Sequence, residues 1–434
     1  MTKTNSQELY RQACQVLPGG ISRNTIFRRP NPDYAASGKG CRVTDVDGRE
    51  RIDFANNMCS LIHGHAHAAT IAAVSAQLQN GTAFTMATEA ELRFAQHLCS
   101  RNPSFDKVRF MNSGTEAVMS GIKLARAITG CPKIAKTEGA YHGTYDYAEV
   151  SQTARPENWG DRDQPSPVPV AMGTPTGALN DVVIFPFNDI PRTLALLDAN
   201  KDELACVLLD LLPHRVGLMP AQMDFIRALR KWTTENKKLL IFDEVITFRM
   251  SYGGAAEWFD ESADLTAMGK IIGGGFPVGA LAGKDEFMSA MDPSGSTLPL
   301  PHSGTFSANP ITMTAGLAAM QDFDQAAVMR LNELGEYARQ QINSAITNAK
   351  VVASVTGAGS MFRLHLRETA PTEYRSTFQD AQEVTKIKQL VQFLYDQGFM
   401  MINTCSAALS TAMNEAEIDL LAESVEQGLR TLGQ

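Results

Sequence analysis

The segment from Leu239 to Gly283 constrains the fold of this chain more than any other part of the sequence. It begins with the short, unbroken apolar run Leu239–Phe242, which predicts a strand buried on both faces of a parallel sheet. That run ends in the acidic pair Asp243-Glu244, and a charge at a buried strand end needs a partner. A second short strand, Leu265–Gly269, ends directly before Lys270. The segment therefore predicts strand ends that carry a carboxylate and an amine.

Lys270 is followed by the apolar and glycine residues 271–275. Such surroundings remove water from the amine, lower its pKa and favour the neutral nucleophile that Schiff-base chemistry uses. Pyridoxal 5'-phosphate needs a lysine of this kind, together with a carboxylate, here Asp243, that keeps its ring nitrogen protonated. Alone, Lys270 is equally typical of a surface lysine beside a turn, and Asp243 of a carboxylate that closes a strand. Together they predict this cofactor, with Lys270 as the catalytic residue.

A phosphate site is predicted where a strand turns into a helix. The strand Val108–Met111 is followed by the small polar turn Ser113, Gly114 and Thr115 and then by an amphipathic helix. This arrangement directs free backbone N–H groups and the positive end of a helix at an anion. The alternative is a capped helix start that binds nothing.

Two features follow the next strand. Tyr141 lies at a strand's carboxyl end, where an aromatic ring can cover the face of a flat cofactor, although core packing is the alternative. Residues 153–181 are rich in proline, glycine and polar residues, and a loop of this length in a compact domain is typical of a functional lid or mobile segment.

Three more apolar runs, at 182–187, 205–211 and 239–245, alternate with helical patterns near 190–200 and 221–236. Alternation of this kind predicts an α/β fold with a mainly parallel, doubly covered sheet whose ligand lies at the carboxyl ends of the strands. The last 120 or so residues change to an α+β pattern. We expect an N-terminal segment (1–60) that packs with a smaller C-terminal domain (313–434), and a large cofactor-binding domain (61–312).

Nearly the whole chain resembles the class III, fold type I pyridoxal-phosphate aminotransferases. The resemblance is carried by LLIFDEV (239–245), DLTAMGKIIGGGFPVGALAG (264–283), NSGTEA (112–117), GAYHG (139–143) and HSGTF (302–306). Within the class it is most similar to the glutamate-1-semialdehyde aminomutases and the β-amino-acid aminotransferases.

The resemblance implies further site residues. It adds His142 and Val245 to the cofactor site and assigns Thr305 to the cofactor phosphate of a neighbouring subunit, which implies a homodimer with a shared active site. It places the segment that holds Met58 at the mouth of the substrate pocket. Arg23 matches a substrate-carboxylate arginine of the β-amino-acid aminotransferases, with a solvated loop arginine as the alternative.

One departure from the family concerns the substrate carboxylate. The related β-amino-acid aminotransferases carry an arginine near the carboxyl terminus, and the matching residues 403–408 contain none. Arg215, on a loop after a strand end, is a candidate replacement, and an ordinary surface arginine is the alternative. Whether Arg23, Arg215 or neither binds a carboxylate decides whether the amino donor is an acid or a plain amine.

The leading function is therefore transfer of an amino group from an amine, ω-amino acid or β-amino acid to a keto acid through a Lys270 Schiff base. The alternative is an intramolecular aminomutase of the glutamate-1-semialdehyde type. A non-catalytic phosphate-binding protein is disfavoured, because NSGTEA and the triple glycine match neither GxGxxG nor the P-loop spacing.

Charge and cysteine usage limit the partners and the location. A net charge of −8 argues against nucleic-acid and anionic-membrane partners, and no stretch reaches the length of a membrane span. Seven scattered cysteines without a CxxC pair indicate reduced thiols and a cytoplasmic protein. His63, His65 and His67 alternate, but no carboxylate or cysteine framework accompanies them, so we expect no metal site.

Overall fold

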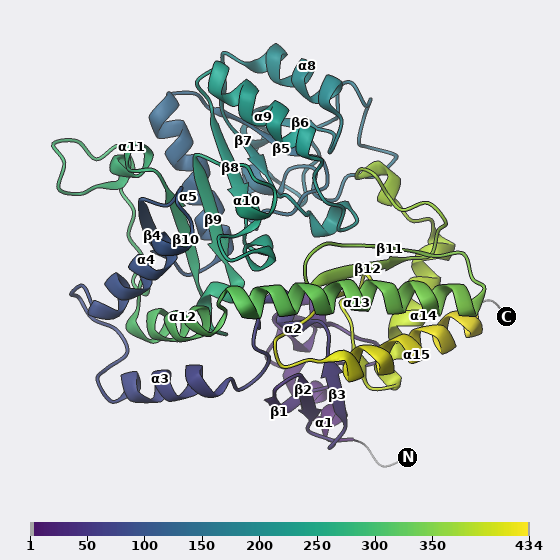
Figure 1. The fold of residues 1–434 in the computed structure, drawn as a ribbon. Coiled ribbons are helices and arrows are strands. Elements are labelled where there is room, and N and C mark those ends of the chain that lie inside the picture. The colour runs from purple at the N-terminus through teal and green to yellow at the C-terminus, as the bar shows by residue number, and fades with distance from the viewer. Residues whose placement is uncertain (1–3, 433–434) are drawn as a thin grey trace.

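The computed structural model describes residues 4–432, and a seven-stranded sheet forms the centre of its larger part (Figure 1). The strand order is β4-β10-β9-β8-β7-β5-β6. Strands β9 to β6 in this order run parallel, whereas β10 runs antiparallel to both of its neighbours. The strands are β4 (Lys107–Met111), β5 (Lys133–Thr137), β6 (Val182–Phe185), β7 (Leu204–Leu209), β8 (Leu239–Asp243), β9 (Leu265–Gly269) and β10 (Gly279–Gly283). The predicted mainly parallel sheet is confirmed.

Helices cover this sheet on both faces, and β8 shows why its sequence is apolar throughout. Leu240 and Phe242 belong to the core that includes helices α8 (Ile190–Asn200) and α9 (Met223–Glu235). Leu239 and Ile241 belong to a second core with helix α5 (Gly114–Thr129). Because alternate side chains of a strand point to opposite faces, both sets must be apolar when both faces are buried.

A second, four-stranded sheet joins the two ends of the chain. Strands β1 (Ala35–Lys39), β2 (Arg42–Asp45) and β3 (Glu50–Asp53) are antiparallel, and β2 and β3 form a hairpin around Gly48. The fourth strand, β13 (Phe399–Met400), comes from the C-terminal region and pairs with β3 in parallel.

The C-terminal region packs its helices against a small sheet. That sheet has the order β11-β12-β14, with strands β11 (Ser354–Thr356), β12 (Met361–His365) and β14 (Ser406–Ala408). The long helix α13 (Gln325–Ala349) runs beside helix α15 (Glu415–Leu432), as Figure 1 shows, and α15 also packs on helix α14 (Ala381–Asp396).

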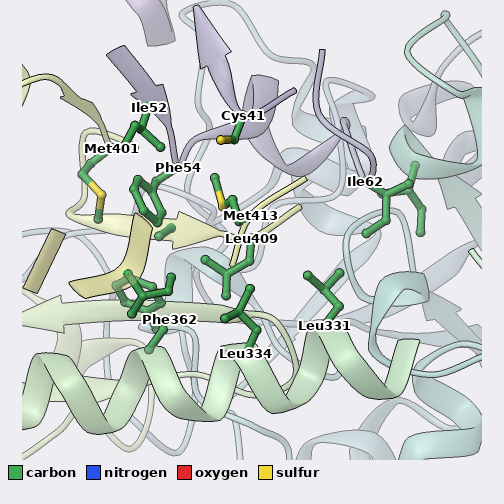
Figure 2. Packing of buried hydrophobic residues seen from close by; sticks show 14 of the residues in the cluster. Cys41, Ile52, Phe54, Ile62, Leu331, Leu334, Phe362, Met401, Leu409 and Met413 are labelled. Carbon is green, nitrogen blue, oxygen red and sulfur yellow. The ribbon is translucent and has the colours of Figure 1, made fainter. Parts of the chain in front are cut away.

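One hydrophobic core connects the N-terminal sheet with this region. In Figure 2, Ile52 of β3 and Phe54, which follows this strand, point toward Leu334 of α13 and Phe362 of β12, with Met401 beside them. The N-terminal strands therefore lose water in a core that they share with the C-terminal region. The division into domains at residues 60 and 312 stays a prediction.

Several remaining helices complete the chain. The longer ones are α1 (Asn5–Ala13), α3 (Ala68–Leu78), α4 (Glu89–Arg101) and α12 (Pro310–Asp322), and the short ones are α2 (Asn56–Cys59), α6 (Asp146–Glu149), α7 (Thr176–Asn180), α10 (Ala255–Trp258) and α11 (Asp285–Met288). Between residues 4 and 432, none of the helices combines the length and the apolar character that crossing a bilayer requires.

Candidate active site

A cavity of about 380 Å³ lies at the carboxyl ends of the strands, on the edge of the sheet where the sequence predicts the ligand. It brings together residues at or just after the carboxyl ends of β4, β5, β7, β8 and β9, which are far apart in the sequence. Its walls are formed by Asn57, Ser60, Asn112, Ser113, Gly114, Thr115, Val118, Tyr141, His142, Gly143, Asp210, Asp243, Val245, Ile246, Lys270, Gly275, Phe276, Pro277 and Val278.

Lys270 faces this cavity from the residue after β9, and its backbone is left-handed (φ 49°). Burial lowers the pKa of its amine, while the nearby groups of Cys59, Asp243 and Asp210 raise it. Within the part of the chain that the structure describes, the amine makes no hydrogen bond or ion pair. A poorly hydrated, unpaired amine is the form that adds to a carbonyl carbon.

Asp243 ends β8 and is only 5% exposed. Its Oδ2 accepts a hydrogen bond from Nδ1 of His142 (2.7 Å), and its Oδ1 accepts one from the Val245 N–H (3.0 Å). Burial lowers the pKa of His142, which favours a neutral imidazole whose Nδ1–H donates to the carboxylate. These two donors hold the Asp243 carboxylate in place.

Asp210 is a second carboxyl group in the cavity, and sequence reasoning assigned it no role. It directly follows β7, which pairs with β8 so that Leu209 is opposite Phe242. Burial, and then the charge of Asp243, raise the pKa of Asp210 well above its usual value. With one carboxylate fixed by His142, the neighbouring acid is favoured in its neutral form. An acid directly after an apolar strand, as at Asp243, was the available signal.

The predicted phosphate turn lies in the cavity at the start of α5. The Ser113 side chain caps the helix by accepting the Glu116 N–H (3.2 Å). The N–H groups of Gly114 and Thr115 have no acceptor among residues 4–432. Gly114 also lies close to Val245, since a Cβ atom added to Gly114 would be 2.8 Å from a methyl group of Val245. Free N–H groups at a helix start beside a narrow wall fit a phosphate.

The turn after β5 brings its aromatic and histidine residues to the same place. Tyr141 is 42% exposed and lines the cavity, so the core-packing alternative is wrong. Gly143 follows with φ 92°, and a side chain there would lie 2.5 Å from the Thr115 hydroxyl. Only glycine allows this turn to lie against the start of α5.

Together these groups fit pyridoxal phosphate. The walls of the cavity carry an unpaired lysine, a fixed carboxylate, an aromatic ring and a helix start with free N–H groups. Eight of the predicted residues line it: Lys270, Asp243, Ser113, Gly114, Thr115, Tyr141, His142 and Val245.

The structure does not place the four other predicted residues in the cavity wall. Thr305 is exposed on the loop before α12. Arg23 donates to Oδ1 of Asn57 (2.7 Å), which does line the cavity. Met58 is half-buried against the core. The guanidinium of Arg215 lies 5.4 Å from the ring centroid of Tyr141, at the rim.

Glu244 and the alternating histidines form contacts outside the cavity wall. Glu244, the second acid after β8, turns away from the cavity and accepts the N–H groups of Ala255 (2.6 Å) and Ala256 (3.0 Å) at the start of α10. Among the alternating histidines, His63 stacks on His67 with ring centroids 4.3 Å apart, and His65 bonds Asp53 (2.9 Å).

The long loop 153–181 is tied down, and none of its residues lines the cavity. Arg375, from the C-terminal region, forms two hydrogen bonds with the buried carboxylate of Glu138 (2.8 and 3.1 Å). The same guanidinium donates to the carbonyls of Trp159 (2.9 Å) and Gly160 (2.8 Å). These bonds hold residues 159 and 160 of the loop to a cation of the C-terminal region, and the role of the loop as a lid or mobile segment stays a prediction.

The remaining wall residues were missed because their own residue types carry no distinctive chemical signal. They are backbone or apolar positions such as Ile246 and residues 275–278, or amides such as Asn57 and Asn112. Asn57 lies in a run with left-handed backbone, Asn56 to Cys59, that the sequence presents only as a polar loop.

Comparison with known proteins agrees with this geometry. The family model Aminotransferase class-III matches residues 29–427. An omega-transaminase structure from Sphaerobacter thermophilus is 44% identical, with a TM-score of 0.97, over 99% of this chain and 98% of that one. A beta-phenylalanine aminotransferase structure from Variovorax paradoxus is 30% identical, with a TM-score of 0.87, over 99% of this chain and 94% of that one.

A curated relative carries a different activity name. Glutamate-1-semialdehyde 2,1-aminomutase of Methanosphaera stadtmanae is 36% identical over 97% of this chain and 99% of its own length. Family membership is common to all these matches, and the cofactor of the family, pyridoxal phosphate, is the one that the cavity fits. The chain therefore belongs to the class III aminotransferases, which are pyridoxal-phosphate-dependent enzymes of fold type I.

Proposed function

We propose that this aminotransferase moves an amino group from a β-amino acid or a related amine to a keto acid, with Lys270 as the catalytic residue. The observation that carries the proposal is the convergence of Lys270 and Asp243 on one cavity with the start of α5. Similarity to an omega-transaminase and a beta-phenylalanine aminotransferase supports this range of donors.

Each wall of the cavity would contribute one function. The N–H groups of Gly114 and Thr115, with Ser113, would bind the phosphate, and Tyr141 would cover one face of the ring. Asp243 would keep the ring nitrogen protonated, and His142 would hold Asp243 in the required orientation. Val245 would limit the width of the ring site.

Proton transfer would be the work of Lys270. Pyridoxal phosphate, when bound, supplies an electron-withdrawing ring that acidifies the C–H bond beside the substrate nitrogen. Once the substrate has displaced its amine, Lys270 would accept the proton from that substrate carbon and return it to the cofactor carbon on the other side of the nitrogen. Burial lowers the pKa of this lysine, which favours the neutral base.

We further propose a homodimer in which Thr305 of one subunit reaches the cofactor phosphate of the other. Support comes from large apolar side chains that one chain leaves exposed around this region, namely Ile71, Leu78, Phe84, Met86 and Phe306. Exposed apolar residues in such number mark association surfaces. The free thiols of all seven cysteines support the predicted cytoplasmic location.

The second candidate is an intramolecular aminomutase, which the curated relatives favour. The two activities share the cavity and differ in the fate of the amino group. The test is to incubate the holoenzyme with an amino donor and pyruvate. Alanine formed in stoichiometric amount supports transfer, whereas an isomerised substrate without a new amino acid supports the mutase.

A further inference from the structure

We infer that Lys136, a buried lysine behind the cavity, is a positioning residue that holds the turn with Tyr141 and His142 in place for cofactor binding. The inference rests on the roles that the proposed function gives to these two residues. Lys136 belongs to β5, and sequence reasoning assigned it no role. It is not among the residues that line the cavity, so it acts through the turn and not on the cofactor itself.

Lys136 occupies a position of β5 that is otherwise suited to an apolar side chain. Its register partners on the two neighbouring strands are Ile184 of β6 and Leu208 of β7, and both belong to the buried core beside α5. Ile134, two residues earlier on the same face of β5, belongs to that core as well. Lys136 is 0% exposed, and an amine without partners is unfavourable in such surroundings. The lysine must therefore make interactions that a leucine could not.

The amine of Lys136 binds three backbone carbonyls from two segments of the chain. Its Nζ donates to the carbonyls of Val150 (2.8 Å), Ala140 (3.1 Å) and Thr137 (3.3 Å). Within residues 4–432, the carbonyls of Ala140 and Val150 accept a hydrogen bond from no other group. One side chain thus joins the end of β5, the turn that follows it and the segment after α6.

The charge state of Lys136 does not decide this role. Burial lowers the pKa of the amine to about 7, the nearby charge of Glu138 raises it, and that of Arg215 lowers it. A charged amine has three N–H donors and a neutral amine has two. The carbonyls therefore keep donors in both forms.

The turn after β5 is fixed on both sides of its cavity residues. On one side, Gly143 lies against the start of α5, where a side chain would not fit. On the other side, Lys136 holds the carbonyl of Ala140, which belongs to the peptide bond that leads into Tyr141. Because a peptide bond is planar, a fixed carbonyl also fixes the direction in which the chain enters Tyr141. Tyr141 and His142 thus lie between two fixed points of the backbone.

Other hydrogen bonds hold only the earlier part of the turn. The N–H of Glu138 donates to the carbonyl of Phe185 (2.8 Å), and that of Gly139 donates to the carbonyl of Ser151 (3.0 Å). Both of these bonds lie before Ala140. The peptide that directly precedes the cavity residues depends on Lys136.

Loss of the amine should therefore reach the cavity. Lys136→Met keeps a long, unbranched side chain but leaves the carbonyls of Ala140 and Val150 buried without a donor, which folded proteins avoid. We expect the turn to shift until these carbonyls find water or another donor. The ring of Tyr141 would move with it, and so would His142, which donates to the carboxylate of Asp243 (2.7 Å).

The first test is an equilibrium titration of apoenzyme with pyridoxal phosphate, followed by absorbance. We expect the dissociation constant to rise about 5- to 30-fold in Lys136→Met, the factor that corresponds to the loss of a hydrogen bond. The visible circular dichroism of the bound cofactor, which depends on the orientation of its ring, should change as well. A dissociation constant equal to that of the wild type would overturn the inference.

Arg101→Met is the matched control for a purely structural contact. Arg101 is also a buried cation that donates to three backbone carbonyls, but none of the residues that it binds lines the cavity; they are Tyr252, Met320 and Phe323. In urea titrations, Arg101→Met should destabilise apoenzyme and holoenzyme equally, whereas Lys136→Met should destabilise the holoenzyme more, because cofactor binding itself is weaker. If the two variants behave alike, Lys136 is only structural and the inference is wrong.

A background without the two cavity side chains tests how Lys136 acts. In Tyr141→Ala with His142→Ala, the further change Lys136→Met should weaken cofactor binding by less than about 3-fold, because the groups that it positions are already absent. Losses that simply add would contradict the inference. If Lys136→Met does not fold, Lys136→Gln replaces it, since the shorter side chain cannot reach all three carbonyls. A folded Lys136→Gln that binds the cofactor as tightly as wild type would also refute the inference.

The two proposals fail in different ways. If the wild type transfers no amino group, the proposed transfer is wrong, and the binding measurements still decide the role of Lys136. If Tyr141→Ala with His142→Ala binds the cofactor as tightly as wild type, the proposed roles of these residues and the inference are both wrong. If that variant binds more weakly but Lys136→Met does not, only the inference is wrong.

Discussion

The contact between Gly114 and Val245 gives the sharpest test of the phosphate site. A Cβ atom at Gly114 would lie 2.8 and 2.9 Å from the two methyl groups of Val245. Unstrained carbon atoms stay roughly 3.5–4.0 Å apart, so Gly114→Ala must displace the start of α5, the segment after β8, or both. Overpacking of this size costs about 1–3 kcal/mol. If the strain is released when the cofactor leaves, pyridoxal phosphate binds about 5- to 150-fold more weakly.

The assay is an equilibrium titration of apoenzyme with pyridoxal phosphate, followed by absorbance. The companion variant Val245→Ala removes the methyl groups that Gly114→Ala would meet. In the double variant, the affinity should recover to within about 3-fold of Val245→Ala alone, because the two changes act through one contact. The reasoning is refuted if Gly114→Ala binds the cofactor as tightly as wild type, or if the losses in the double variant simply add.

Three further predictions follow from the site and its supports. Lys270→Ala should abolish turnover and leave a cofactor that dialysis removes, which absorbance and an alanine-formation assay check; full activity in this variant would disprove its catalytic role. Arg375→Gln leaves the carboxylate of Glu138 buried without its cation, which we expect to lower the free energy of unfolding by about 3–5 kcal/mol and to expose residues 153–166 to protease. The double variant Arg375→Gln with Glu138→Gln should regain part of this stability, because no buried charge remains unpaired. Burial lowers the pKa of His365 to about 3, so the unfolded chain binds a proton at this residue more readily than the native chain, and the free energy of unfolding should fall as pH drops below about 6.5. His365→Gln should reduce the pH dependence of the free energy of unfolding, measured by urea titration, by up to about 1.4 kcal/mol per pH unit. An unchanged pH dependence would contradict this prediction.

The strands that end at the site residues could be predicted, because burial on both faces restricts the residue type at every position of a strand. Leu239–Phe242 has to be apolar at every position, and an acid or lysine directly after such a run is conspicuous. For this reason Asp243 and Lys270 could be paired before the structure was known. The turns at Ser113 and Tyr141 followed from the same rule, that ligands meet strands at their carboxyl ends.

The parts that could not be predicted depend on pairing between distant segments. Arg375 binds Glu138, which is more than two hundred residues earlier in the chain, and holds Trp159 and Gly160 of the loop 153–181. A composition rich in proline and glycine predicted a loop there, but neither this cation nor the short helix α7.

The parallel pairing of Ile52 with Phe399 has a consequence for biosynthesis. A ribosome releases the N-terminal hairpin hundreds of residues before the strand that completes its sheet, so the apolar side chains of that hairpin stay without their partners during most of translation. Closing such a long loop is entropically slow, and the newly made N-terminal segment is the part of this enzyme for which a chaperone would have the longest opportunity to bind.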